Sequence, residues 1–318
     1  MEYIDIFDKN NNPTGEIKEK TKAHEDGGFH RTAHIWIIND KKELLLQKRS
    51  ASKKSHPNCW DISGAGHIKA GESVFDGAIR ELKEELGVVA NENDLQYIAT
   101  IKSTKNPKNM EFAYIYLLNC NKKVEEYIFE DNEVSEVKYV YYKDLEKMVE
   151  DKAEGLLLHN EEFNELFKYI RNIEKDEYYI DIAIEISKKA KYPYGAIVVK
   201  DDKIIGRSDD KTLMETSMYS HAELEAIESA SKIKNLYGDL KDAIMYVSCE
   251  PCMMCMGAIL YEEFSKIVYA ATLKDSNDNY CPEIIVPSKE LAKYSKNKIE
   301  IIAELHRKNA VDVLKSAK

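Results

Sequence analysis

The second half of the chain is organised around the stretch Ser248-Cys249-Glu250-Pro251-Cys252-Met253-Met254-Cys255-Met256-Gly257-Ala258-Ile259-Leu260. Two cysteines lie three residues apart, directly after a proline and before an apolar run. Proline suits the first turn of a helix, where its missing N–H costs nothing, so one helical turn should put Cys252 and Cys255 on the same face at a helix N-terminus. The helix dipole there favours thiolate over thiol. Two thiolates at this spacing are half of a zinc site.

The upstream run His221-Ala222-Glu223 supplies the residue types that complete such a site. Three ligands, His221, Cys252 and Cys255, leave the fourth zinc position open for water, as a catalytic site requires. Zinc then activates that water for hydrolysis. Glu223 is too close to His221 in the chain to be a convenient fourth ligand, so we expect it to carry protons from the water to the substrate and the departing ammonia. A redox pair or half of a structural zinc site are the alternatives for a lone Cys-x-x-Cys.

His-x-Glu followed by Pro-Cys-x-x-Cys is a signature of zinc nucleobase deaminases. Residues 176–318 resemble the cytidine deaminase superfamily, and this resemblance implies an α/β/α domain in which two helix N-termini hold one zinc ion. The hydrophobic pattern agrees with a β-α-β-α-β order. We expect strands at 195–200, 203–206, 243–248 and 266–271, helices from Tyr178 to Lys191 and from His221 to about Lys234, and a strand and a helix after Lys298.

The choice of deaminase substrate is harder to predict. Pro193-Tyr194-Gly195-Ala196 and the cysteine motif look most like the guanine deaminase group, although tRNA adenosine deaminases share much of the pattern. Both groups place a base-binding Asn about eleven residues before the zinc histidine, where this chain has Asp210. An ionised Asp accepts hydrogen bonds but cannot donate them. The resemblance assigns substrate binding to Asp210, Tyr194, Ala222 and Glu283, with Asp275 and Asp278 as further acidic candidates; solvated loop carboxylates are the alternative.

A second motif occupies residues 66–88 of the first half: Gly66-His67-Ile68-Lys69-Ala70-Gly71-Glu72, seven residues, then Arg80-Glu81-Leu82-Lys83-Glu84-Glu85-Leu86-Gly87-Val88. Helical apolar spacing runs from Val74 to Leu86, and Gly87 ends the helix. Three carboxylates then share one helix face. Crowded oxygen ligands of this kind suit Mg²⁺ or Mn²⁺, and an arginine can brace them from the flank. The alternative is a solvated acidic helix face.

This motif resembles the Nudix hydrolase family, whose pattern is Gly, five residues, Glu, seven residues, then Arg-Glu-apolar-any-Glu-Glu-any-Gly-apolar. The resemblance implies a mixed-sheet α/β/α sandwich over about residues 1–170 and metal-assisted hydrolysis of a diphosphate joined to another group. It assigns the magnesium site to Glu81, Glu84 and Glu85, catalysis to Glu84 and Glu85, and the orientation of these carboxylates to Arg80.

The residues around this motif look like the isopentenyl diphosphate isomerase branch, notably 44–50, 53–54, Trp60 and 71–73. That enzyme uses a cysteine just before the Gly-His pair, where this chain has Ala65, so we expect hydrolysis rather than isomerisation. For several polar residues the sequence allows either a role in a functional site or a purely structural or solvent-exposed role. A metal site could be lined by His24, His30 and His67, and the alternative is that these are ordinary histidines. Phosphate groups could be bound by Arg49, Lys48, Lys53 and Lys54, and the alternative is a solvated basic loop. A candidate general base is Glu133.

Composition limits the function classes. The chain has 318 residues, 43% of them hydrophobic, which is enough for two domains with their own cores. The net charge of -11 argues against a broad nucleic-acid or anionic-membrane surface, and the second half has no basic cluster of the kind that binds a tRNA backbone. Six cysteines without a disulfide framework, an N-terminus unlike a signal peptide and no apolar run of about 20 residues predict a cytoplasmic protein.

The sequence therefore predicts an α/β protein of two domains, a Nudix sandwich over 1–172 and a cytidine deaminase-like domain over 176–318, joined by a short charged linker at 172–176. The predicted function combines zinc-dependent deamination of a purine base or nucleoside with Mg²⁺- or Mn²⁺-dependent diphosphate hydrolysis. We expect a homodimer through the deaminase domain. The alternatives are a tRNA adenosine deaminase with an appended Nudix domain, a cytosine or dCMP-type deaminase, and a module that binds nucleotides without turnover.

Overall fold

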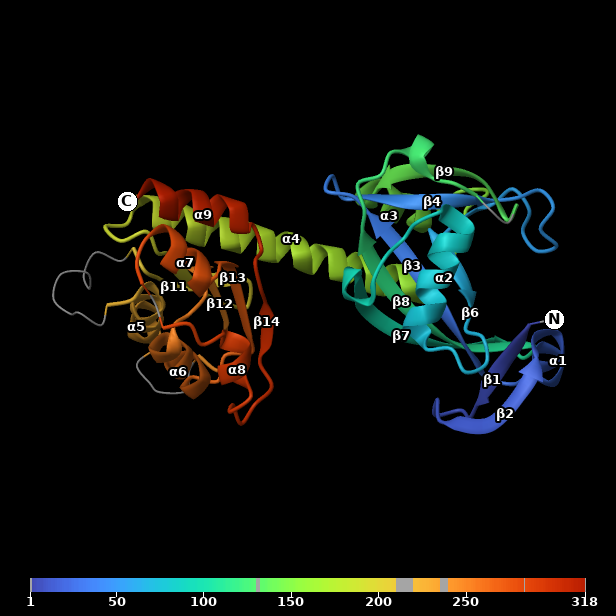
Figure 1. The fold of residues 1–318 in the computed structure, drawn as a ribbon, viewed down its shortest axis with the longest axis horizontal. Coiled ribbons are helices and arrows are strands. Elements are labelled where there is room, and N and C mark those ends of the chain that lie inside the picture. The colour runs from blue at the N-terminus through green and yellow to red at the C-terminus, as the bar shows by residue number, and fades with distance from the viewer. Residues whose placement is uncertain (1, 130–131, 210–219, 235–239, 283, 318) are drawn as a thin grey trace. The chain divides into compact units, whose positions relative to one another are not determined.

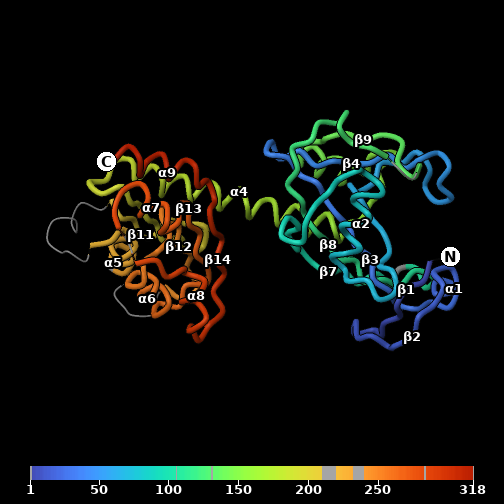
Figure 2. The backbone as a smooth tube through the Cα atoms, in the orientation of Figure 1, coloured from blue at the N-terminus to red at the C-terminus, as the bar shows by residue number. Residues whose placement is uncertain are grey.

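The computed structural model describes residues 2–129, 132–209, 220–234, 240–282 and 284–317, and it divides into two compact units, Met1–Ile170 and Arg171–Lys318 (Figures 1 and 2). The first unit contains a two-stranded sheet, β1 (Tyr3–Phe7) and β2 (Pro13–Glu19), and a seven-stranded mixed sheet. The strands of the larger sheet are β3 (His30–Ile38), β4 (Glu43–Arg49), β5 (Trp60–Asp61), β6 (Gly64–His67), β7 (Leu95–Asn106), β8 (Asn109–Asn119) and β9 (Val134–Tyr141). Its helices are α1 (Lys20–Asp26), α2 (Val74–Leu86) and α3 (Tyr142–Glu150), with 3₁₀ turns at Glu92–Asp94 and Val124–Glu126.

Strand β3 pairs mainly with β6 and β8 rather than with β4. The turn after β3 forms, but β3 and β4 do not make a full hairpin, because β3 pairs with β6 antiparallel and with β8 in parallel along His30–Ile38. The only β3–β4 pair is Ile38 with Leu44, and β4 pairs with β9 instead. Helix α1 directly follows β2 and ends at Gly27 in the left-handed conformation.

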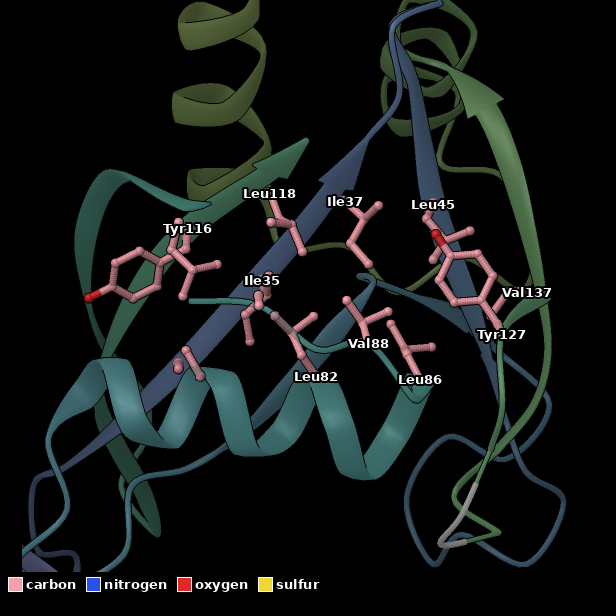
Figure 3. Close-up of a cluster of buried hydrophobic side chains, with 14 of the residues drawn as sticks. Ile35, Ile37, Leu45, Leu82, Leu86, Val88, Tyr116, Leu118, Tyr127 and Val137 are labelled. Atoms are coloured by element: carbon pink, nitrogen blue, oxygen red, sulfur yellow. The ribbon is translucent and has the colours of Figure 1, made fainter. Parts of the chain in front are cut away.

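Helix α2 has the predicted limits. The hydroxyl of Ser73 accepts a hydrogen bond from the backbone N–H of Asp76 and caps the first turn, and Gly87 ends the helix with φ 62°. The apolar face of α2 packs on the central strands of the sheet, which Figure 3 shows for Leu82 and Leu86. This packing holds the acidic face of the helix along the edge of β6.

Helix α3 packs against β4 and β9, and the first turns of the long helix α4 (Asn160–Lys189) pack on β3, where the rings of Phe163 and Trp36 are 5.4 Å apart. Buried Glu162 accepts hydrogen bonds from Nε1 of Trp36 and Nδ1 of His34, both at 2.8 Å. Burial alone would lower the pKa of His34, but the carboxylate of Glu162 outweighs it and raises that pKa to about 9. An ion pair therefore fastens the start of α4 to β3.

The second unit has one five-stranded sheet in the order β11-β10-β12-β13-β14. Strands β12 and β13 run parallel, as do β13 and β14, whereas β10 is antiparallel to both of its neighbours. The predicted order of elements is confirmed, including the strand and helix of the tail. The limits are β10 (Ala196–Lys200), β11 (Lys203–Arg207), α5 (Ala222–Lys234), β12 (Ile244–Cys249), α6 (Met253–Tyr261), β13 (Lys266–Ala271), α7 (Leu273–Asn279), α8 (Ser288–Ala292), β14 (Glu300–Ile302) and α9 (Arg307–Ser316).

Helices cover both faces of this sheet (Figure 1). The second half of α4 and α9 pack on one face, with Ile180, Ala183 and Val313 in the core. Helices α5 and α6 pack on the other face, where Ala226 of α5 and Met256 of α6 are part of the buried core. The carboxyl ends of β12 and β13 lead into α6 and α7, so the loop that carries the cysteines lies at that edge of the sheet. None of the helices within the described ranges is long and apolar enough to cross a membrane.

The expected linker at 172–176 is wrong in its structure, because α4 runs through it as one helix. Its charged residues resembled a solvated junction, but Asp176 is only 3% exposed. The carboxylate of Asp176 accepts hydrogen bonds from the hydroxyl of Tyr246 and the ammonium group of Lys266, both at 2.6 Å. These bonds tie α4 to β12 and β13. The assignment of the two domains to 1–172 and 176–318 stays a prediction.

We predict that Asp176→Ala lowers the free energy of unfolding of the second unit by about 3 kcal/mol, because it leaves the ammonium group of Lys266 buried without its partner. The matched control is Lys175→Ala, one residue away, whose pair with Asp202 is exposed and should contribute less than about 1 kcal/mol. Urea unfolding followed by circular dichroism measures the change, while fluorescence of Trp36 and Trp60 reports on the first unit alone. Equal curves for the two variants would contradict this role of Asp176.

Candidate functional site

The three predicted zinc ligands come together in the second unit. His221 directly precedes α5, Cys252 is the N-cap residue of α6, and Cys255 lies in the first turn of α6. One ligand atom from each of these residues lies within 4.8 Å of the other two. Helix α6 begins two residues later than Pro251, so the cysteines span the cap and the first turn rather than one face of a full turn.

The distances in this cluster fit a tetrahedral zinc site. Nδ1 of His221 and Sγ of Cys252 are 3.6 Å apart. Zinc bonds of ~2.3 Å to sulfur and ~2.0–2.1 Å to nitrogen at a tetrahedral angle would separate these two atoms by about 3.6 Å. The donor set of one imidazole and two thiols is also typical of zinc. The residues present therefore fit this ion without rearrangement.

Electrostatics in the cluster favour a thiolate. The pKa of Cys252 is lowered to about 4, first by hydrogen bonding from Cys255 and then by His221, although burial opposes this. The same interaction and burial raise the pKa of Cys255, because the two sulfur atoms compete for one proton. A cation bound between them would remove that competition.

Glu223 lies in the first turn of α5, beside the cysteines, and is only 6% exposed. Burial raises the pKa of its carboxyl group to about 7, and the negative charge on Cys252 adds to the rise. A carboxyl group with a pKa near neutrality can both accept and release a proton, which is the property required of a general acid and base.

The predicted substrate-binding residues have mixed outcomes. The hydroxyl groups of Tyr194 and Ser276 are 2.7 Å apart, and Ala222 is buried at the start of α5. Asp210 and Glu283 lie outside the described residues. The other two acidic candidates have different partners: Asp275 pairs with Arg307 and caps α7, and Asp278 pairs with Lys274.

In the first unit, Arg80 gathers the acidic residues of the second motif. Its guanidinium group donates hydrogen bonds to Glu72, Glu81 and Glu84, and to the backbone carbonyl of His67. Burial would raise the pKa of Glu72, but Arg80 lowers it overall, whereas burial raises the pKa of Glu81. Arg80 therefore holds three carboxylates together, and the sequence had assigned no separate role to Glu72.

Glu85 and Gly66 show how closely this helix approaches β6. Glu85 is 4% exposed, and one of its oxygens accepts hydrogen bonds from the backbone of Ala65 and the amide of Gln47. A Cβ on Gly66 would lie 1.9 Å from the carboxyl carbon of Glu81, so a larger residue there would displace this carboxylate. Gln47 was missed from the sequence, because its pairing with Glu85 depends on a contact between β4 and α2.

Three of the four predicted phosphate-binding residues already form ion pairs. Arg49 donates to a carboxylate oxygen of Asp61 at 3.1 Å and to Ser55. Lys53 pairs with Glu133, the candidate base, and Lys48 pairs with Glu136. A phosphate group that binds to these side chains would therefore have to replace their present carboxylate partners.

Three histidines form a second group of ligand atoms within 4.8 Å of one another in the first unit, namely His24, His30 and His67. Nε2 of His24 and Nε2 of His67 are 3.2 Å apart, which fits two imidazoles on one ion at bond lengths of ~2.0–2.1 Å. Nε2 of His30 is buried and has no hydrogen-bond partner among the residues that the structure describes, and it lies 3.9 Å from a carboxylate oxygen of Glu111. Glu111 was missed, because it reaches this group only through the parallel pairing of β3 and β8.

Comparisons with known proteins support both halves of this description. The Nudix domain model matches residues 28–158, and the model of the cytidine and deoxycytidylate deaminase zinc-binding region matches residues 173–271. The chain is 36% identical over 188 residues to an uncharacterized Nudix hydrolase of Clostridium acetobutylicum, covering 56% of this chain and 89% of that protein. It is 30% identical over 146 residues to a tRNA-specific adenosine deaminase of Buchnera aphidicola, covering 44% of this chain and 91% of that protein.

The chain belongs to both families. The deaminase half is also similar to guanine deaminase of Bacillus subtilis, with 40% identity over 84 residues, 26% of this chain and 53% of that protein. The Nudix half is similar to an isopentenyl-diphosphate Delta-isomerase of Halorhodospira halophila, with 32% identity over 119 residues, 37% of this chain and 67% of that protein. The predicted resemblances are confirmed, and the relatives differ in the substrates that their names give.

We predict that the purified chain contains about one zinc ion and that Cys252→Ala loses it, because two remaining ligands bind zinc far more weakly than three. The matched control is Cys281→Ala, which removes an exposed cysteine outside the cluster and should retain zinc. Elemental analysis after dialysis measures both. Full zinc in Cys252→Ala would exclude this cluster as the zinc site.

Proposed function

We propose that the chain is a bifunctional enzyme, in which the second unit deaminates a purine base or nucleoside by hydrolysis and the first unit hydrolyses a diphosphate-containing compound. The observation that carries the deaminase proposal is the meeting of His221, Cys252 and Cys255 with buried Glu223 beside them. Zinc bound there would lower the pKa of water and supply the nucleophile. The two families to which the chain belongs support a hydrolytic reaction in each unit.

The residues of the chain have separate proposed roles. Glu223 takes one proton from the attacking water and delivers it to the ring nitrogen. It then carries the second proton, from the hydroxyl group so formed, to the leaving amine. Tyr194 lies two residues before β10 with its hydroxyl group held by Ser276, and in this proposal its ring packs against the base. Burial of Glu223 keeps bulk water from competing for the proton.

Guanine is our first choice of substrate. The Pro-Tyr-Gly-Ala motif and the similarity to guanine deaminase support it, and Asp210 would accept hydrogen bonds from the N1–H and amino groups of guanine. Editing of tRNA is the alternative, supported by the similarity to tRNA-specific adenosine deaminase. The net charge of -11 argues against tRNA editing, because binding to an RNA backbone requires a basic surface.

We predict that Glu223→Gln retains zinc but lowers ammonia release from guanine by about 10²–10⁴-fold, the usual contribution of a general acid and base. The matched control is Glu228→Gln, an exposed residue on the same helix, which should keep nearly full activity. Steady-state kinetics on guanine, adenine, cytosine and their nucleosides measure both variants. Inosine formation in a tRNA anticodon stem-loop without turnover of any free base would replace the guanine proposal by the editing alternative.

For the first unit we propose that Glu81, Glu84 and Glu85 bind Mg²⁺ or Mn²⁺ and that Glu84 and Glu85 take part in diphosphate hydrolysis. The observation that supports this is the set of carboxylates assembled by Arg80 along β6. Such crowding is unfavourable without a cation. Ala65 stands where the isomerase-like pattern has its cysteine, which supports hydrolysis over isomerisation.

We also propose that His24, His30 and His67 bind a second divalent ion in this unit. The unpartnered nitrogen of His30 supports it, because a buried nitrogen without a hydrogen bond costs about 1–3 kcal/mol unless something binds it. Glu111 is close enough to complete the ligand set after a small movement.

We predict two classes of Mn²⁺ site in the zinc-loaded protein. Glu85→Gln should remove one class together with diphosphate hydrolysis, and His24→Ala should remove the other, since the two groups share no ligand. Titration followed by electron paramagnetic resonance measures binding, and ammonia release should stay unchanged in both variants. Loss of ammonia release in a folded Glu85→Gln protein would contradict independent active sites.

A homodimer through the second unit and a cytoplasmic location complete the proposal. Exposed apolar side chains on or near α6 and α8 support the dimer, since such groups gain from burial against a partner. They are Met253, Met254, Tyr261, Ile285 and Tyr294. The six free cysteines agree with a reducing compartment.

A further inference from the structure

Glu250 is a buried carboxylate next to the zinc cluster that the proposed chemistry does not use. It is 7% exposed and lies two residues before Cys252. One oxygen accepts a hydrogen bond from the backbone N–H of Ser288 at 2.8 Å, and the other accepts one from the backbone N–H of Leu273 at 3.3 Å. A single side chain therefore joins the cysteine loop to the first residues of α7 and α8.

Other bonds repeat this connection. The backbone N–H of Glu250 donates to the carbonyl of Ala271 at 2.8 Å, and the hydroxyl of Ser288 donates to the carbonyl of Pro251 at 3.4 Å. The negative charge of Glu250 also contributes, after burial, to the raised pKa of neighbouring Tyr269. The carboxylate thus lies at the centre of a hydrogen-bonded junction between the cysteine loop and the segment that follows β13.

That segment leads to Tyr194. Residues 271–282, which we call the α7 segment, contact Tyr194 twice: Ser276 holds its hydroxyl group at 2.7 Å, and Tyr280 packs edge-on against its ring with the centroids 5.9 Å apart. The connection from Glu250 to Leu273, and along one turn of α7 to Ser276, is continuous. Movement at the start of α7 would therefore move the group that orients Tyr194.

We propose that Glu250 is a positioning residue for base recognition, which acts by holding the α7 segment against the cysteine loop so that Tyr194 faces the substrate. This inference rests on the proposed base deaminase function. A carboxylate suits the role because it accepts two backbone N–H groups from separate segments at once. An amide in its place keeps the size but turns an NH₂ donor towards one of these N–H groups, which leaves a buried donor unsatisfied.

The expected effect of Glu250→Gln is on KM rather than on zinc content or kcat. We expect KM for guanine to rise about tenfold, which corresponds to ~1.4 kcal/mol, with zinc unchanged and kcat nearly unchanged. Tyr194→Phe, which removes the hydroxyl bond to Ser276, should raise KM by a similar factor. Because both changes act on one connection, the double variant should rise little further, so the effects should be non-additive.

Hydrogen exchange gives a reading that does not require turnover. Peptides within residues 271–282 should exchange faster in Glu250→Gln than in the unmodified chain, because the amide of Leu273 loses its acceptor. The control is Asp176→Asn, which disturbs another buried carboxylate, at the amino ends of β12 and β13, and should change neither exchange in the α7 segment nor KM.

Each outcome decides the matter. Unchanged exchange in the α7 segment, or faster exchange with an unchanged KM, would overturn the proposal, as would additive effects of Glu250→Gln and Tyr194→Phe. Loss of zinc in Glu250→Gln would mean that the residue supports the metal site instead. If the unmodified chain releases no ammonia from guanine or any other free base, the proposed function fails on that result alone, whereas the exchange data still test the positioning of α7.

Discussion

The structure of the second unit depends on the close approach of the first residues of α5 and α6, which brings three potential zinc ligands within 4.8 Å of one another. Nδ1 of His221 at the start of α5 and Sγ of Cys252 at the start of α6 lie 3.6 Å apart, and both helices pack on the same face of the sheet. Strand β12 then delivers the cysteine loop at its carboxyl end. The sheet and the two helices therefore position the three ligands and Glu223 together. Hydrogen bonds between Glu250 and α7, and between α7 and Tyr194, connect this cluster to Tyr194.

In the first unit, a positively charged side chain gathers several carboxylates. There, Arg80 neutralises carboxylates that would otherwise repel one another, and Gly66 leaves space for the carboxylate of Glu81. The carboxylates lie on the α2 side of β6, whereas His67 and His30 belong to the separate histidine group. One short strand thus separates two places suited to divalent cations, and this arrangement is compatible with chemistry on a phosphate group.

Features set by local sequence were predictable, and features set by distant contacts were not. The limits of α2 followed from Gly87 and the apolar spacing, and the grouping of His221, Cys252 and Cys255 followed from motif spacing. The continuity of α4 was missed, because the partners that bury Asp176 come from β12 and β13 far along the chain. Gln47 and Glu111 were missed for the same reason, since strand pairing alone brings them to their sites.

The central claim is that one imidazole and two thiolates of this chain bind a zinc ion with an open fourth position. X-ray absorption at the zinc edge of the zinc-loaded protein tests it most directly, because it counts ligand types by bond length. We expect two sulfur neighbours at ~2.3 Å and two nitrogen or oxygen neighbours at ~2.0–2.1 Å. A shell of four sulfur atoms, or one without sulfur, would contradict the proposed site.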